Sequence, residues 1–290
     1  MAPKTTLSAT TMSSQESSKN DGATKDLVEQ RTSQDTQPTE QELLKAIGWN
    51  SKYKNKTLEE VDEVMAQITH LKLHGLTPPL TRVDDLKRFK ALSVLYLYDN
   101  KISYIGSLAP CKGLTHLYLQ NNSLESTEMI QSLPNLKKLY MDCNCVARVS
   151  GLYGCSALEE LHLSDQRLDS ETSLEFNNGS LTSIAPTLKV FIAQGNNMSD
   201  VSKLSTLVEL EEVDFSRNKI RESTSLKEMF EKCAKLKKLS LLSNPICKTS
   251  RGIEAEAILT CQNLEEFNNK EVTDKKRKCI QVMSTRKTKK

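Results

Sequence analysis

The sequence predicts an α/β solenoid, in which a short parallel strand and its connecting segment repeat along the chain. The first observation is a nine-residue pattern, L-x-x-L-x-L-x-x-N, which residues 92–100 display as LSVLYLYDN. The second is its regular recurrence, with spacings of 22, 22, 22, 30, 22 and 26 residues between the closing residues Asn100, Asn122, Asn144, Gln166, Asn196, Asn218 and Asn244. A recurrence of this kind is typical of the leucine-rich repeat.

The pattern also assigns the two faces of each strand. Side chains alternate across a strand, so Leu95 and Leu97 should point into the core, whereas Val94, Tyr96 and Tyr98 should point outward. The closing asparagine recurs where the chain turns, and its amide can pair with backbone groups that the turn leaves without partners. A degenerate first copy begins at Ile68 and has Leu76 in place of asparagine.

Four segments follow from the composition along the chain. Residues 1–38 are rich in Ser and Thr and contain no aromatic residue, so we expect disorder there. Residues 39–67 contain two capping boxes, at Thr39 and Thr57, and should form a helical N-terminal cap. Residues 68–273 form the leucine-rich-repeat solenoid with its own C-terminal cap, and residues 274–290 form a basic, disordered tail.

Two irregularities interrupt the solenoid. The 30-residue spacing indicates an eight-residue insertion between residues 167 and 188, where Asn177, Asn178 and Gly179 are typical of a turn. The last copy continues into CQNLEEFNNKEVTD, where Leu264 and Phe267 should cover the end of the core. An exposed solenoid end needs such a cap.

Charge and cysteine usage restrict the class of protein. The net charge is +3, and residues 274–290 carry eight basic residues and one acidic residue, so the rest of the chain carries 3 − 7 = −4. No run of about 18 apolar residues and no secretory signal are present, so we expect a cytoplasmic chain without a membrane span. The cysteines should therefore be reduced. Four of them share one apolar repeat position: Cys111, Cys155, Cys233 and Cys261.

No motif for catalysis or cofactor binding was found. The phosphate-binding loop, the dinucleotide fingerprint and the H-E-x-x-H zinc motif are all absent. Cys143-x-Cys145 has no second Cys/His pair at zinc-finger spacing, so no metal site is predicted. We therefore expect a non-enzymatic protein without a cofactor.

The outward strand face carries the candidate binding site. The fifth repeat position holds Tyr96, Tyr118, Tyr140 and His162 in successive copies. Adjacent strands lie about 4.8 Å apart, so these rings should form a column on the concave side of the solenoid. Tyrosine is enriched at interface hot spots, although a column could also only stabilise the sheet. The candidate partner-binding residues are Tyr96, Tyr98, His116, Tyr118, Lys138, Tyr140, Asp142, Glu160 and His162.

The basic tail is a second candidate. Lys275, Lys276, Arg277 and Lys278 form its first cluster, and no aromatic residue lies among them. Specific nucleic-acid recognition is therefore not predicted. Charge alone could attract tubulin or another acidic partner, or the tail could act as a nuclear import signal or simply stay solvated.

Several stretches resemble the cytoplasmic leucine-rich-repeat family of Sds22, a regulator of protein phosphatase 1. They are ITHLKL, LSVLYLYDN, LTHLYLQNN and LEELHLSDQRL, together with the S-N-P-I-C run of residues 243–247 and the F-x-x-K-E-V run of residues 267–272. The resemblance extends from about Leu43 to Val272 and includes neither the first 38 residues nor the tail.

The resemblance implies a monomeric regulatory subunit of protein phosphatase 1 at the centrosome or cytoskeleton, with the catalytic subunit bound on the concave face. No docking peptide of the basic-Val-x-Phe type is found, because the nearest matches, around Phe191 and Phe215, lie inside predicted strands. Two alternatives stay open: a cytoskeletal, ciliary or centrosomal scaffold that binds tubulin or centrosomal proteins without the phosphatase, and a nuclear adaptor of the splicing A′ type.

Overall fold

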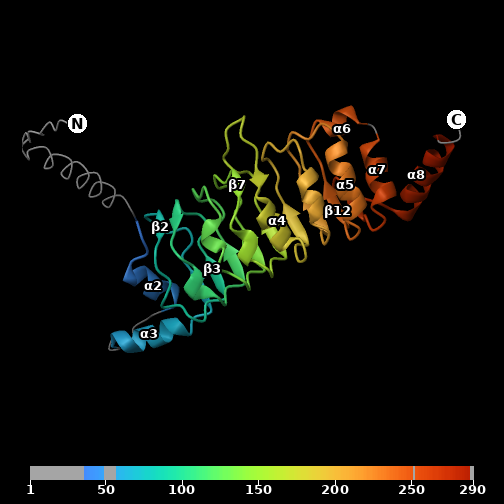
Figure 1. Cartoon of the computed structure of the whole chain (residues 1–290). Coiled ribbons are helices and arrows are strands. Elements are labelled where there is room, and N and C mark those ends of the chain that lie inside the picture. Colours follow the sequence, from blue (N-terminus) through green and yellow to red (C-terminus); the bar gives the residue numbers. More distant parts are fainter. Residues whose placement is uncertain (1–35, 49–56, 251, 288–290) are drawn as a thin grey trace, which may run out of the picture. The chain divides into compact units, whose positions relative to one another are not determined.

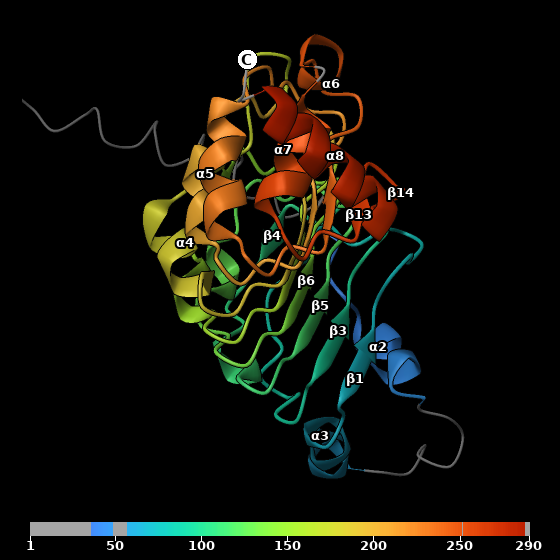
Figure 2. The same ribbon diagram turned by 90° about the vertical axis from the view of Figure 1, so that its right-hand side faces the viewer.

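The computed structural model describes residues 36–48, 57–250 and 252–287. The predicted disordered segment 1–38 lies almost wholly outside these ranges. Apart from Thr36, the described residues belong to one compact unit that begins at Gln37. Within it, stacked repeats place strands along one side and helices α4 and α5 along the side away from them (Figures 1 and 2).

The N-terminal cap consists of two short helices, as the sequence predicts. In α2 (Glu40–Ala46) and α3 (Leu58–Ala66), the Thr39 and Thr57 side chains each complete a capping box. Helix α3 buries Val61 and Met65 against the first repeat. Arg88 joins both helices, because its guanidinium lies 2.7 Å from Glu40 and 2.6 Å from Asp62.

One ten-stranded sheet runs the length of the solenoid. Its strands, in spatial order, are β1 (His70–Lys72), β3 (Val94–Tyr96), β5 (His116–Tyr118), β6 (Lys138–Tyr140), β8 (Glu160–His162), β10 (Val190–Ile192), β11 (Glu212–Asp214), β12 (Lys238–Ser240), β13 (Glu266–Phe267) and β14 (Lys270–Glu271). All pairs are parallel except β13–β14, which turns back and closes the C-terminal edge. The α/β leucine-rich-repeat solenoid predicted from the sequence is therefore confirmed.

The connecting segments are short and mostly lack long helices. They hold two small sheets, β2 (Arg82–Val83) with β4 (Tyr104–Ile105) and β7 (Arg148–Val149) with β9 (Glu175–Phe176). The 3₁₀ helices are η2 (Ala109–Cys111), η3 (Glu128–Ile130), η4 (Leu152–Gly154) and η5 (Ser202–Thr206). The α-helices are α4 (Asn178–Ile184), α5 (Thr224–Lys232), α6 (Ile246–Thr249), α7 (Ile253–Thr260) and α8 (Asp274–Lys287). Helices are about 10 Å wide, whereas neighbouring strands lie about 4.8 Å apart. Stacked repeats therefore take more room on the side of the helices than on the side of the strands. The solenoid accordingly curves with the sheet on its inner side.

The core is a ladder of identical positions. The register pairs Leu71, Leu95, Leu117, Leu139 and Leu161 across successive strands, and all five are fully buried. Val94, predicted to be exposed on the outer face, is instead only 8% exposed. It lies in register between His70 and His116, whose longer side chains flank it.

The closing asparagines hold neighbouring repeats together. The Asn144 amide donates to the carbonyl oxygens of Leu119 in the preceding repeat (2.9 Å) and Met141 in its own (3.0 Å). Its Oδ1 accepts the Leu124 N–H at 3.0 Å. Gln166 makes the same three kinds of bond with its longer side chain, so the departure from asparagine preserves the function of the position.

The residue before each closing amide takes a left-handed conformation. The φ angles are +56° at Asp99, +54° at Asn121, +56° at Cys143 and +53° at Asp165. Non-glycine residues rarely adopt this conformation, and Asn and Asp tolerate it best. The turn thus points the following amide inward, where it bonds two repeats at once.

The insertion contains a helix rather than only a turn. Asn177 caps α4, and its side chain accepts the Gly179 N–H at 2.8 Å. Asparagine favours both turns and helix N-caps because its side chain bonds free backbone N–H groups, whereas glycine favours turns because it lacks a Cβ atom. The sequence therefore located the chain reversal but not the helix that follows it.

The C-terminal cap is confirmed, whereas the disordered tail is not. Leu264 and Phe267 are buried at the end of the core. Residues 274–287 form α8, and Arg277 donates to the carbonyl oxygens of Ile258 and Leu264, at 2.5 and 2.6 Å. Lys276 also pairs with Glu254 at 2.6 Å. Two of the four predicted tail cations therefore hold α8 against the solenoid. Arg277 binds carbonyl oxygens in the last turn of α7 and in the segment after it, and Lys276 binds a carboxylate in the first turn of α7.

We predict that Asn144→Ala lowers the free energy of unfolding by about 2 kcal/mol, because it leaves the buried Leu124 N–H unpaired and removes one of the two amide donors from each of the Leu119 and Met141 carbonyl oxygens. Asn144→Gln should cost clearly less, since Gln166 shows that the position accepts the longer amide. Chemical denaturation of the two variants tests this. Equal losses would show that side-chain length, not hydrogen bonding, decides stability there.

The repeat cysteines should react slowly with thiol reagents. Cys111, Cys155, Cys233 and Cys261 are buried, and burial raises the pKa of each thiol, to about 11 for Cys111 and Cys233 and about 12 for Cys155 and Cys261. A raised pKa means less thiolate, the reactive form, at pH 8. In native labelling followed by mass spectrometry, exposed Cys279 should react first and these four only on unfolding. Rapid native labelling of the four would contradict the buried assignment.

Candidate functional site

The outward face of the ten-stranded sheet, here called the sheet face, carries the predicted aromatic column. The ring centroids of Tyr96 and Tyr118 lie 4.8 Å apart, those of Tyr118 and Tyr140 also 4.8 Å, and those of Tyr140 and His162 4.5 Å. The rings within each tyrosine pair are nearly parallel, with interplanar angles of 11° and 4°. The parallel register places the same repeat position side by side, so the repeat spacing alone produces the stack.

A shorter stack lies beside the first. His74 and Tyr98 lie two residues after the fifth position of their repeats. Their ring centroids are 4.3 Å apart and the angle between the ring planes is 10°. In both stacks the rings cover one another's faces. A molecule on the sheet face therefore meets mainly the ring edges and hydroxyl groups.

A hydrogen-bonded cluster around Glu160 occupies the centre of the face. Its carboxylate lies 2.6 Å from the Tyr140 hydroxyl, 2.7 Å from Lys138 Nζ and 2.9 Å from His162 Nε2. The structure thus brings together four of the nine predicted site residues. Burial opposes ionisation of Glu160, but the bonds from Lys138 and Tyr140 lower its pKa. Burial and the bond to Glu160 raise the pKa of Tyr140 well above its usual range.

The remaining predicted residues lie on either side of this cluster. Asp142 accepts the Ser164 N–H at 2.6 Å and so contacts the next repeat. His116 bonds the Thr115 hydroxyl through Nδ1 at 2.8 Å. Burial, followed by the charge of Lys138, lowers the pKa of His116, so the ring is neutral at pH 7. Tyr96, Tyr98 and Tyr118 are half-buried in their stacks.

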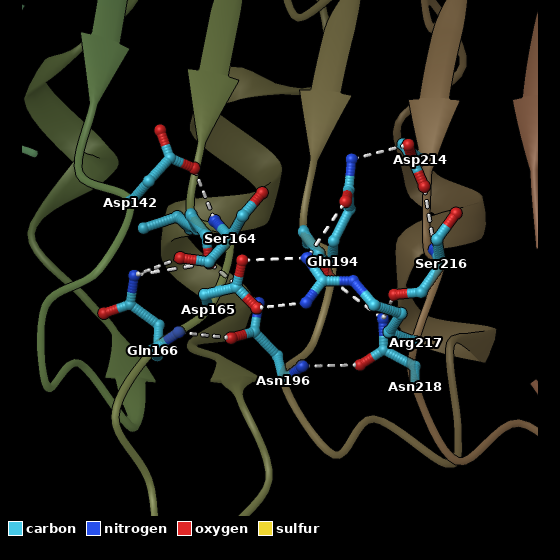
Figure 3. Close-up of polar contacts among 12 residues, drawn as sticks. Asp142, Ser164, Asp165, Gln166, Gln194, Asn196, Asp214, Ser216, Arg217 and Asn218 are labelled. Carbon is cyan, nitrogen blue, oxygen red and sulfur yellow. Dashed lines mark hydrogen bonds and ion pairs between the residues drawn. The ribbon is translucent and has the colours of Figure 1, made fainter. Parts of the chain in front are cut away.

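A second polar network lies at the strand ends toward the C-terminal half of the face (Figure 3). Arg217 donates two bonds of 2.8 Å to Asp165 and one of 3.1 Å to Gln194. Gln194 in turn donates to Asp214 at 2.7 Å. Asp165 and Arg217 are two repeats apart, so the ion pair spans the repeat between them.

Gly195 makes that ion pair possible. It occupies the left-handed position of the intervening repeat, with φ of +66°. A Cβ atom there would lie 2.3 Å from Asp165 Oδ1 and 3.5 Å from the Arg217 guanidinium. The sequence analysis missed this network. The signal that could have revealed it is Gly195 at the position before the closing amide, where the preceding copy has Asp165 and the following copy has Arg217.

The described ranges contain no group of three or more side chains that could hold a metal ion. No helix in those ranges has the length and apolarity to cross a bilayer.

Glu160→Gln should change how stability depends on pH. The Glu160 pKa is lowered on folding, so its ionised form stabilises the fold above its unfolded pKa of about 4.3, and this contribution disappears as the pH falls through the lowered value. The difference in unfolding free energy between wild type and Glu160→Gln should be largest above about pH 5 and shrink in acid. A difference that does not vary with pH would contradict the charge-based role of Glu160. Denaturant titrations at several pH values provide the measurement.

Comparisons with known proteins agree with the repeat architecture. A family model described as "Leucine Rich repeats (2 copies)" matches residues 112–154. Among solved structures, internalin F from Listeria monocytogenes is 20% identical, with a TM-score of 0.57 over 78% of this chain and 59% of the internalin. Internalin C2 from the same species is 20% identical, with a TM-score of 0.54 over 78% and 89% of the two chains.

The Leptospira interrogans leucine-rich-repeat protein LIC12759 is 24% identical, with a TM-score of 0.54 over 73% of this chain and 57% of that one. The chain thus spans less than two thirds of internalin F and of LIC12759. At these identities the likeness concerns the fold alone. The repeat geometry and the matches together establish that this chain has the leucine-rich-repeat fold.

Proposed function

We propose that the chain is a non-catalytic protein-binding scaffold whose sheet face holds its partner. The observation that carries this proposal is the continuous column from Tyr96 through Tyr118 and Tyr140 to His162, which no other part of the described chain covers. Rigid aromatic side chains lose little conformational entropy on binding and are frequent at interface hot spots.

The surrounding polar groups supply orientation. The Glu160 cluster and the Arg217 network are fixed by their own hydrogen bonds, so they present charges in defined positions. Fixed polar groups around a central aromatic patch set the register of a protein interface.

The finer part of the proposal concerns the partner. The resemblance of the repeats to the Sds22 family supports the catalytic subunit of protein phosphatase 1 as that partner, with the chain acting as a regulatory subunit at the centrosome or cytoskeleton. Lys276 and Arg277 contribute little to this proposal, because both are engaged in the fold.

The test is binding of the purified phosphatase catalytic subunit, measured by titration calorimetry. Tyr96→Ala with Tyr118→Ala should weaken binding by at least about 2 kcal/mol, which is about thirtyfold. The matched control is Tyr104→Ala with Tyr153→Ala, since these tyrosines are 52% and 56% exposed and lie outside the ten-stranded sheet. Circular dichroism confirms that both variants fold.

Two outcomes would count against the proposal. Equal affinity of the folded sheet-face variant and wild type would remove the sheet face as the binding site. No binding by wild type would remove the phosphatase and leave the scaffold to be tested with tubulin and centrosomal proteins.

A further inference from the structure

The sheet face is chemically divided along the solenoid. Its first three strands contribute nine outward positions, none of which carries a carboxylate: His70, Lys72, His74, Val94, Tyr96, Tyr98, His116, Tyr118 and Gln120. The later strands carry the acids Asp142, Glu160, Glu212 and Asp214 at the corresponding positions. The electrostatic character therefore changes between β5 and β6.

The hydrogen-bonding state also changes there. Around Glu160, the Tyr140 hydroxyl, Lys138 Nζ and His162 Nε2 all bond the carboxylate, and the charge of Lys138 is neutralised by that carboxylate at 2.7 Å. In contrast, the Tyr96 and Tyr118 hydroxyls and the Lys72 ammonium make no hydrogen bond or ion pair with the part of the chain that the structure describes. We call Lys72, Tyr96 and Tyr118 the N-terminal patch.

The N-terminal patch forms a row across the strands. Lys72 lies in register with Tyr96, and Tyr96 with Tyr118. Burial raises the pKa of Tyr118, so its hydroxyl keeps its proton at neutral pH and can donate. Any partner that covers this row must offer hydrogen-bond acceptors, since covering a donor without an acceptor costs free energy. The positive charge of Lys72, with no carboxylate among the neighbouring positions, favours acceptors that are negatively charged.

We propose that the N-terminal patch binds an acidic polypeptide segment, whose carboxylates accept hydrogen bonds from the Tyr96 and Tyr118 hydroxyls and pair with Lys72. This proposal rests on the proposed function, because it assigns the chemistry of the partner on the same face. Two strand spacings of about 4.8 Å separate Lys72 from Tyr118, so an extended run of about three residues covers the row. In the cluster around Glu160, Lys138 and the Tyr140 hydroxyl are already bound to the Glu160 carboxylate, so they are not free to bind a further carboxylate and the site ends on that side.

The experiment measures fluorescence anisotropy of a labelled ten-residue glutamate peptide titrated with the full-length chain. A ten-residue glutamine peptide is the uncharged control. The glutamate peptide should bind at least about tenfold more tightly, as expected for charge-assisted bonds. Lys72→Glu should weaken binding about tenfold or more, and Tyr118→Phe, which removes one hydroxyl but keeps the stacked ring, should weaken it by a few-fold to about tenfold.

Helix α8 provides the matched control, because it carries the exposed cation Lys275 far from the row in the sequence. Lys275→Glu should change the affinity less than twofold. Equal or larger loss with Lys275→Glu than with Lys72→Glu would overturn the proposal, as would equal binding of the glutamine peptide or no binding of either peptide. The proposed function is tested independently of these peptides. It is contradicted if the variant with both Tyr96→Ala and Tyr118→Ala binds the protein partner as tightly as wild type.

Discussion

The structure depends above all on the bond between one repeat's closing amide and the backbone of the repeat before it. Asn144 illustrates it: one side chain satisfies a carbonyl in its own turn, a carbonyl in the preceding repeat and an N–H across the interface. Short strands of three residues offer few ladder hydrogen bonds, so these buried amides supply much of the specificity of stacking. The left-handed residue before each amide directs it inward, and the conservative change to Gln166 keeps all three bonds.

The same register that stacks the core leucines also stacks the sheet face. Tyr96, Tyr118 and Tyr140 lie 4.8 Å apart because their repeats are in phase, not because the rings select one another. Stacking, however, hides the ring faces. What a partner meets is therefore decided by the hydroxyls and charges: a self-satisfied cluster around Glu160, and a row at Lys72, Tyr96 and Tyr118 that makes no bonds with the described part of the chain. The bonded groups around Glu160 therefore make the face rigid, whereas the groups of the Lys72, Tyr96 and Tyr118 row are available to bind a partner.

Long-range contacts between charged groups explain where the sequence analysis fell short. Lys276 and Arg277 belong to a run of four cations, a pattern typical of a solvated tail, yet they reach Glu254 and the carbonyl oxygens of Ile258 and Leu264. The Asp165–Arg217 pair likewise spans a repeat and needs the missing Cβ of Gly195. No local pattern contains either contact, because each joins segments that only the superhelical stack brings together.

The sequence by itself determined the repeat phase, the buried leucine positions, both helical capping boxes and the aromatic column, because each follows from local periodicity or from hydrogen bonds within a few residues. It thus placed all nine candidate residues on one face in the correct order. Only the tertiary structure decided which of them are engaged: Lys138, Tyr140, Glu160 and His162 bond one another, whereas Tyr96 and Tyr118 keep unpaired hydroxyls within the described ranges. The physical reason is that a hydrogen bond forms only when donor and acceptor atoms on neighbouring strands lie within a few tenths of an ångström of the ideal distance. A repeat pattern fixes where each residue lies on the sheet but not how far the end of its side chain extends.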